Sequence, residues 1–341
     1  MAYSNQLTKE QQAQLVQEKV SKSFAKVSSD VVSLFDKDAL PSFLAFAAKF
    51  HYFDIYNLIL LYKQRPAATF VASFETWRRI SVNHWHDPSR PVFLVSQKGK
   101  GLGILVPYIL KKKVSDVPNH RSAVAPSRVI TYFDYHVGWV FDKEQTNGIP
   151  SPVLEWDLAN SQIDAEAAFH AIREVAPFTV TFSGEGNFRG NYVFEEARQD
   201  SGSPDTLVLN GKYRNEHYTL CNFMIRVFVV QYLEGMDQQF DPNEFEKIAE
   251  CVSFVVASHF GLSTSDYAFF FARTWASSSQ RMLEILNAIC QVAHLIIDEI
   301  EIAMIEYKAL FGDNQDIYGF PDSDDVFAFE NLTIFDMFPK E

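Results

Sequence analysis

Aromatic, amide and cationic side chains occur together in two short stretches of the first hundred residues. Their members are Tyr56, Asn57, Gln64, Arg65, Trp77, Arg78 and Arg79. A protein that binds single-stranded nucleic acid needs flat rings on which bases can stack and cations that contact the phosphates. The stretches therefore indicate a nucleic-acid interface, and burial in a core is the alternative for each aromatic ring.

Further positive charge lies in two lysine-rich stretches that follow. The first is the glycine-bearing turn at residues 97–101 (QKGKG), and the second is a run of three lysines. Glycines on both sides of a lysine allow a hairpin turn, because glycine adopts positive and negative φ angles about equally. We expect residues 111–127 to form a loop. The candidate phosphate contacts are Lys98, Lys100, Lys111, Lys112 and Lys113.

Motifs for catalysis and for metal binding are missing from the sequence. It contains no GxSxG, no CxxC, no HExxH and no phosphate loop that ends in Gly-Lys-Ser or Gly-Lys-Thr. A metal site built from His84, His86, Asp87 and His136 is conceivable, but histidines in solvated loops are the favoured interpretation. We therefore expect no catalytic residue, no metal and no cofactor.

Charge is distributed unevenly along the 341 residues. Residues 1–150 hold 19 Lys and Arg against 12 Asp and Glu, a net charge of +7, and residues 151–341 carry −20. This asymmetry suggests that the first half meets a polyanion. Three cysteines in apolar segments indicate reduced thiols. The polar N-terminus and the short apolar runs give no sign of a signal peptide or a membrane span, so we expect a cytoplasmic protein.

The pattern of apolar residues predicts helices first and strands later in the basic half. Helical spacing covers residues 7–36, Pro41 opens a helix that reaches residue 50, and Asp54 caps another over residues 55–64 that Pro66 ends. A helical piece is expected at 74–80. Strands are expected at residues 92–96, 103–110, 129–133 and 138–141.

The acidic half begins after the linker-like stretch 147–152 (NGIPSP). A helix over 164–175 and short strands at 178–182, near 192 and at 206–209 precede long helices at 218–234, 243–260 and 278–310. The last 30 residues, 312–341, carry eight acids and one lysine interleaved with aromatic residues, which is typical of an interaction tail.

Four ordered pieces of the basic half resemble the single-stranded-DNA-binding domain of ArdC-type antirestriction proteins. They are residues 56–66 (YNLILLYKQRP), residues 68–77 (ATFVASFETW), residues 98–107 (KGKGLGILVP) and residues 140–146 (VFDKEQT). The resemblance covers roughly residues 45–150. The family's basic Gly-Arg-x-Val step is replaced here by residues 80–91.

Parts of the acidic half resemble the zinc-peptidase-like domain of the same proteins. They are residues 248–256 (IAECVSFVV), residues 259–267 (HFGLSTSDY) and Trp275. The resemblance implies an HExxH motif at residues 222–226, where Asn222, Phe223 and Arg226 stand instead. Zinc needs paired histidines one helical turn apart and a carboxylate that activates water. Glu250, the implied third ligand, survives alone, and we expect it to pair with Arg226.

The sequence thus predicts an α+β protein of two domains and a tail. Residues 1–150 form an ArdC-like domain of helices and a small antiparallel sheet, and residues 151–311 form a mainly helical zincin-like domain without catalysis. The tail is residues 312–341. The resemblance implies a single-stranded-DNA-binding counter-defence protein of a plasmid, another mobile element or a phage. The alternative is an acidic decoy that mimics DNA and blocks a host restriction or defence nuclease. The tail acts either on its own DNA-binding domain or by recruiting a partner.

Overall fold

The computed structural model describes residues 9–85, 100–115, 127–146, 156, 158–184, 190–196, 205–236, 240–275 and 278–311. These residues form two compact units. Unit 1 comprises the described residues among 1–28 and 59–149, and unit 2 those among 29–58 and 150–329. The division near residue 149 lies next to the predicted domain boundary. Residues 29–58, which the sequence analysis groups with the basic half, belong to unit 2.

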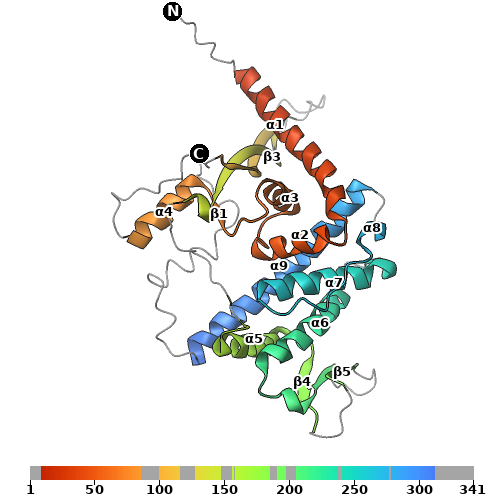
Figure 1. The fold of residues 1–341 in the computed structure, drawn as a ribbon. Helices are drawn as coiled ribbons and strands as arrows, with labels where there is room; N and C mark the ends of the chain where they lie inside the picture. Colours follow the sequence, from red (N-terminus) through yellow and green to blue (C-terminus); the bar gives the residue numbers. More distant parts are fainter. Residues whose placement is uncertain are drawn as a thin grey trace, which may run out of the picture. The chain divides into compact units, whose positions relative to one another are not determined.

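Helices α1 (Lys9–Asp30), α3 (Ile55–Gln64) and α4 (Phe74–Trp85) contribute to the basic half (Figure 1). The bounds of α3 follow from local chemistry. The side chain of Asp54 accepts the backbone N–H of Asn57 at 3.0 Å, which satisfies a donor at the start of the helix. Pro66 lies just beyond its end. The division between the units falls inside α3, so that Ile59–Gln64 belong to unit 1.

The sheet of unit 1 has the strand order β1-β3-β2 and is antiparallel. Strand β1 (Val71–Ala72) pairs with the end of β3 (Ser127–Asp142), and β2 (Leu102–Ser115) pairs with β3 along its whole length. The predicted loop at 111–127 is therefore wrong at both ends. Lys111–Lys113 extend β2, with Lys112 opposite Ile130, and the two strands expected at 129–133 and 138–141 are one.

Unit 2 consists mainly of helices. They are η1 (Val31–Leu34), α2 (Ala39–Lys49), α5 (Gln162–Val175), η3 (Gly211–Tyr213), α6 (His217–Gly235), α7 (Pro242–His259), α8 (Ala272–Trp275) and α9 (Ser279–Phe311). Figure 1 shows α2, α6, α7 and α9 side by side. A small sheet has the order β4-β6-β5, in which β4 (Thr179–Phe182) is parallel to β6 (Thr206–Leu209) and β5 (Tyr192–Glu195) is antiparallel to it.

Local signals set the ends of the unit 2 helices. Ser161 accepts the N–H of Asp164 at the start of α5, and Asp241 accepts the N–H of Asn243 at the start of α7, where Pro242 occupies the first turn. Helix α7 ends at His259, and Gly261, two residues further on, has a φ of +65°, which favours glycine. The N–H of Leu262 then bonds to the carbonyl of Ala257 at 2.9 Å, which fixes the last turn of α7.

The core of unit 2 contains all three cysteines, Cys221, Cys251 and Cys290, each buried as a free thiol. Burial raises the pKa of Cys290 to about 12, and it also raises the pKa values of the other two thiols. All three are therefore protonated at neutral pH, which fits the expected core thiols.

The α+β class that the sequence predicts is confirmed. Most predicted helices and strands occur within a few residues of their expected bounds, and α8 is an addition. The expected strand at 92–96, Lys98, His86, Asp87 and the tail at 312–341 lie outside the described residues. None of the helices in the described part of the chain is long and apolar enough to span a membrane.

Candidate nucleic-acid interface

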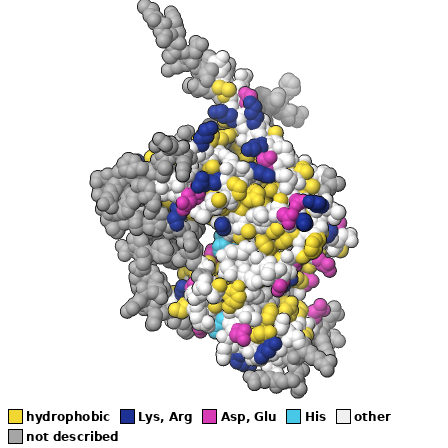
Figure 2. Space-filling model, viewed as in Figure 1, with side chains coloured by type: hydrophobic (Ala, Val, Ile, Leu, Met, Phe, Trp, Pro, Cys, Tyr) yellow, Lys and Arg dark blue, Asp and Glu magenta, His cyan; other side chains and the backbone are white. Residues whose placement is uncertain are grey.

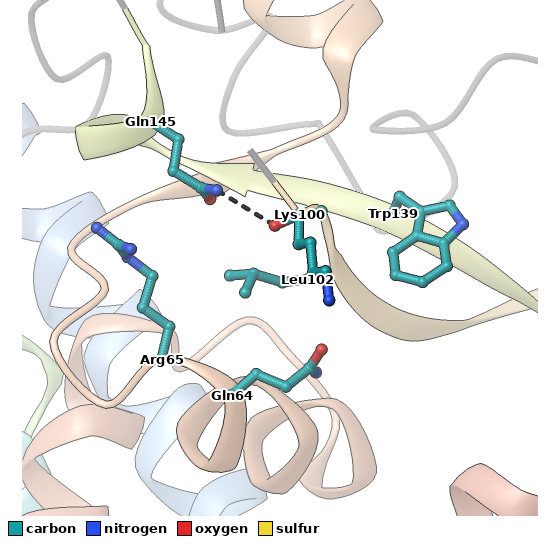
Figure 3. A pocket seen from close by; sticks show the side chains of 7 residues that line it. Gln64, Arg65, Lys100, Leu102, Trp139 and Gln145 are labelled. Carbon is teal, nitrogen blue, oxygen red and sulfur yellow. Dashed lines mark hydrogen bonds between the residues drawn. The ribbon is translucent and has the colours of Figure 1, made fainter. Parts of the chain in front are cut away.

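A hollow of about 770 Å³ lies in unit 1 between the end of α3 and the start of β2 (Figure 3). Its lining residues come from three stretches of the chain and are Gln64, Arg65, Lys100, Gly101, Leu102, Trp139 and Gln145. Two cations, two amides and an indole thus surround one space. These are the groups that contact phosphates, base edges and base faces in single-stranded nucleic acid.

The two amides hold the backbone of the hollow in place. Gln64 Nε2 donates to the carbonyl of Gly103 at 2.8 Å, and its Oε1 accepts the N–H of Gly103 at 2.8 Å. These two hydrogen bonds join α3 to β2. Gln145, in η2 (Lys143–Gln145), donates from Nε2 to the carbonyl of Lys100 at 3.2 Å. The rim of the hollow is therefore fixed before any ligand binds, which reduces the entropy lost on binding.

The indole of Trp139 is the large exposed ring at this hollow, with 57% of its surface accessible. Trp139 lies opposite Gly103 in the β2–β3 ladder. A Cβ atom placed on Gly101 would lie 3.1 Å from Trp139 Cβ, so the ring occupies space that a side chain at Gly101 would need. Glycine at this position leaves room for the indole beside β2. Trp139 is not among the predicted contacts, although the alternation of residue types along the strand, with Val140 buried next to it, is a signal that its side chain faces outward.

The cations of the hollow differ in how they are held. Arg65 has one third of its side chain exposed, and its Nε bonds to the buried carboxylate of Asp142 at 2.5 Å. Its guanidinium is thus oriented by the protein. Lys100 is exposed and extends from the start of the strand (Figure 3). Lysine side chains also occupy the surface of α1 (Figure 2).

Two predicted contact residues are structural instead. Trp77 is fully buried, and its indole Nε1 donates to the carbonyl of Phe141 at 2.8 Å. Asn57 is also fully buried and donates from Nδ2 to Asp54 at 2.8 Å. Neither side chain can reach a base without unfolding of its surroundings. The structure thus places Trp77 in the core of unit 1 and Asn57 at the start of α3, and neither side chain is exposed.

The remaining predicted contacts are dispersed. Tyr56 is exposed and belongs to unit 2, outside the hollow. Arg78 and Arg79 are exposed on α4, and Nη1 of Arg78 lies 3.7 Å from Oε2 of Glu75. Lys98 lies outside the described residues, and the structure gives Lys111, Lys112 and Lys113 a backbone position in β2 only. Of the predicted set, the hollow brings together Gln64, Arg65 and Lys100.

An ion pair between Arg226 and Glu250 stands where the family resemblance implies a zinc site. Arg226 Nη1 lies 3.5 Å from Glu250 Oε2, as the sequence predicts, and the guanidinium carbon lies 4.0 Å from the centre of the Tyr267 ring. The second oxygen of Glu250 accepts the N–H of Ala268 at 3.2 Å. Burial raises the pKa of Tyr267 to about 12, so its hydroxyl is neutral. Positive charge therefore occupies the place beside Glu250.

The other residues at this position do not fit a metal ion either. Asn222 Nδ2 donates back to the carbonyl of Tyr218 at 3.1 Å, and the ring of Phe223 packs against Tyr213 with 5.3 Å between centroids. An amide that is bonded to its own helix and a phenyl ring provide no ligand for zinc. The residues at 222–226 and Glu250 thus do not form a zinc site.

Comparisons with known proteins give distant structural matches. No protein-family model matches the sequence, and no curated protein sequence matches it. Two matching solved structures are of the antirestriction protein ArdC from plasmid R388, one metal-free and one with bound Mn(II). The metal-free structure has a TM-score of 0.42 and 13% identity, over 74% of this chain and 86% of the other. The Mn(II)-bound structure has a TM-score of 0.39 and 14% identity, over 75% and 86%.

Proposed function

We propose that unit 1 binds single-stranded DNA in the hollow beside Trp139, and that the protein protects the DNA of a mobile element or phage against host restriction. The observation that carries the proposal is the exposed indole of Trp139 in one hollow with Lys100 and Arg65. The indole stacks on a base, and the two cations contact the phosphates on either side of it.

Two features of the sequence support the same function. The net charge of +7 over residues 1–150 attracts a polyanion. The four motifs that resemble the ArdC-type DNA-binding domain include residues of the hollow, among them Gln64, Lys100 and Gln145. The antirestriction role follows from that resemblance. Because the Arg226–Glu250 pair replaces the implied zinc site, the proposed role needs no peptidase activity from those residues.

The test is the affinity of the full-length protein for a labelled single-stranded oligonucleotide, measured by fluorescence anisotropy at several salt concentrations. Trp139→Ala weakens binding by about 5- to 100-fold, the range for loss of one stacked base, and leaves the salt dependence unchanged. Lys100→Ala lowers the slope of log K against log salt by about 0.7, because one phosphate contact is lost. Trp139→Phe keeps a flat ring and retains most of the affinity.

Matched controls come from unit 2. Phe270→Ala removes an aromatic ring that is 84% exposed, and Lys247→Ala removes one positive charge from α7. Neither change should alter the affinity or the salt slope. A wild-type protein that ignores single-stranded DNA at low salt, or a Trp139→Ala variant that binds as well as Phe270→Ala, would refute the assignment. In cells, Trp139→Ala should also reduce protection of DNA that enters a restricting host.

A further inference from the structure

Three histidines and two carboxylates meet in unit 2, away from every motif that the sequence analysis selected. They come from the turn after α2, the last residue of α7 and one face of α9, and are His51, His259, His294, Asp298 and Glu301. His51 belongs to both possible sets of three ligands, one with His294 and Asp298 and the other with His259 and Glu301. Imidazole and carboxylate groups are the nitrogen and oxygen ligands of zinc.

The distances in the first set fit one ion. His51 Nδ1 lies 3.1 Å from His294 Nδ1 and 3.6 Å from Asp298 Oδ1, and His294 Nδ1 lies 3.3 Å from Asp298 Oδ1. Ligand atoms of a tetrahedral zinc ion lie roughly 3.3 Å from one another. The circle through the three atoms has a radius of about 1.9 Å, slightly below the zinc–ligand distance of about 2.0–2.1 Å. An ion just outside their plane would therefore contact all three.

His51 is the most buried of these three side chains, and Asp298 is the most exposed. The His51 side chain is 11% exposed, and its ring lies 4.8 Å from that of His259 and 5.3 Å from that of His294 between centroids, whereas the Asp298 side chain is 43% exposed. His294 and Asp298 are four residues apart on α9 and so share one face of it. An ion could enter from the Asp298 side. Three protein ligands with an open side leave a fourth coordination position for water or a substrate.

The other two residues of the cluster, His259 and Glu301, lie beside His51. His259 has one ring nitrogen, Nδ1, at 2.8 Å from the carbonyl of Ala48, so this nitrogen carries the hydrogen and donates it. Its Nε2 lies 2.8 Å from Glu301 Oε1, which also accepts the indole N–H of Trp156 at 2.7 Å. Glu301 and His259 are thus already bonded to each other and to the protein. The His259 ring packs edge-on against the His51 ring, with 4.8 Å between centroids, and so limits the orientations of that proposed ligand.

We propose that His51, His294 and Asp298 bind one zinc-class divalent ion, with His259 and Glu301 packed beside it. This site is separate from Glu250, where Arg226 takes the place of a metal. We expected no metal because the sequence lacks an HExxH motif. A site made of His51, His294 and Asp298 does not require that motif. The proposal stands independently of DNA binding by unit 1.

The test uses the full-length protein, stripped with a chelator and titrated with ZnCl₂ by calorimetry. Co²⁺ is a second probe, because its visible absorption reports nitrogen and oxygen ligands in tetrahedral geometry. The wild-type protein should bind one ion per chain, and zinc should raise its melting temperature. His294→Ala and Asp298→Asn should each weaken zinc binding by at least tenfold, since loss of a ligand exceeds the effect of about 10–100-fold reported for outer partners.

His217→Gln is the matched control, because it removes an imidazole at the start of α6, outside the cluster, where Nδ1 contacts Gln162. This variant should bind zinc as the wild type does. Circular dichroism of the stripped variants shows whether each one is folded. No binding by the folded wild type, or equal affinity in His294→Ala and His217→Gln, would overturn the site. Loss of binding in Glu301→Gln with full binding in Asp298→Asn would overturn this ligand set and place the ion between His51, His259 and Glu301.

Discussion

The Nε atom of Arg65 lies 2.5 Å from Oδ2 of Asp142, and the Asp142 side chain is completely buried. Its other oxygen, Oδ1, accepts the backbone N–H of Thr69 at 3.2 Å and of Phe70 at 3.5 Å. One carboxylate thus joins the end of α3, the segment before β1 and the last residue of β3. The same contact orients Arg65 at the hollow, so stability and the proposed DNA contact depend on one ion pair.

Asp142→Ala should lower the free energy of unfolding by about 3 kcal/mol, because it leaves a partly buried guanidinium and two backbone donors without their acceptor. Glu144→Ala removes an exposed carboxylate two residues away and should change the same quantity by less than about 0.5 kcal/mol. Urea denaturation of the full-length variants measures both. Similar stabilities for the two variants would show that the Asp142 carboxylate is not a structural tie.

Trp77→Ala should unfold unit 1 rather than specifically weaken DNA binding. Trp77 is fully buried and packs edge-on against Phe70, with 5.2 Å between ring centroids. Removing a buried tryptophan costs about 3–5 kcal/mol. Near-UV circular dichroism and urea denaturation should show the loss. In Trp139→Ala the same measurements should remain close to wild type while affinity falls, and a folded Trp77→Ala variant with selectively weakened DNA binding would contradict the assignment of Trp77 to the core.

Gly101→Ala should weaken DNA binding without removing any contact group. The added Cβ would lie 3.1–3.3 Å from atoms of Trp139 and Phe141, so the indole must move. We expect a loss of about threefold, a fraction of the effect of removing a stacked ring. Gly103→Ala is the control, because the nearest atom to its Cβ would lie 3.5 Å away. Equal affinities of the two alanine variants would show that the position of Trp139 beside β2 does not matter for binding.

Local sequence signals predict the elements of this fold better than they predict its strand pairing. The bounds of α3 are read correctly from Asp54 and Pro66, because a cap and a proline act within a few residues. The length of β2 is missed at Lys111–Lys113. Three lysines have low strand preference on their own, and pairing with residues 129–131 of β3 overrides it.

The functional sites are harder to predict from the sequence than the helices and strands, because they combine residues from distant segments. The Arg226–Glu250 pair is predicted because the family resemblance brings the two positions together, and the structure confirms the contact. Trp77, a predicted contact, is buried, and Trp139, for which no role was predicted, is exposed, since composition alone does not tell a buried ring from an exposed one. His51, His259 and His294 stand in three distant segments. No spacing along the chain connects them, and the packing of α2, α7 and α9 brings them together.

The Arg226–Glu250 pair should contribute a measurable coupling energy. A double-mutant cycle with Glu250→Gln and Arg226→Met isolates it, because Gln keeps an oxygen that can accept the N–H of Ala268 and Met keeps an apolar contact with the Tyr267 ring. The Arg226 side chain is 36% exposed and the Glu250 side chain 25%, so screening by water limits the coupling to about 1 kcal/mol. Urea denaturation of the four proteins measures it, and a coupling near zero would mean that the pair is not a stabilising replacement for a metal.

The same variants separate this pair from the proposed zinc site. Glu250→Gln should bind zinc with wild-type affinity, because His51, His294 and Asp298 are unchanged and Glu250 already faces a guanidinium. Calorimetric titration of the stripped protein with ZnCl₂ measures this, with His294→Ala as the variant that should fail to bind. If Glu250→Gln lost zinc while His294→Ala retained it, Glu250 would be a ligand after all. The ion pair would then describe only the metal-free form, and Arg226 would have to move away when zinc binds.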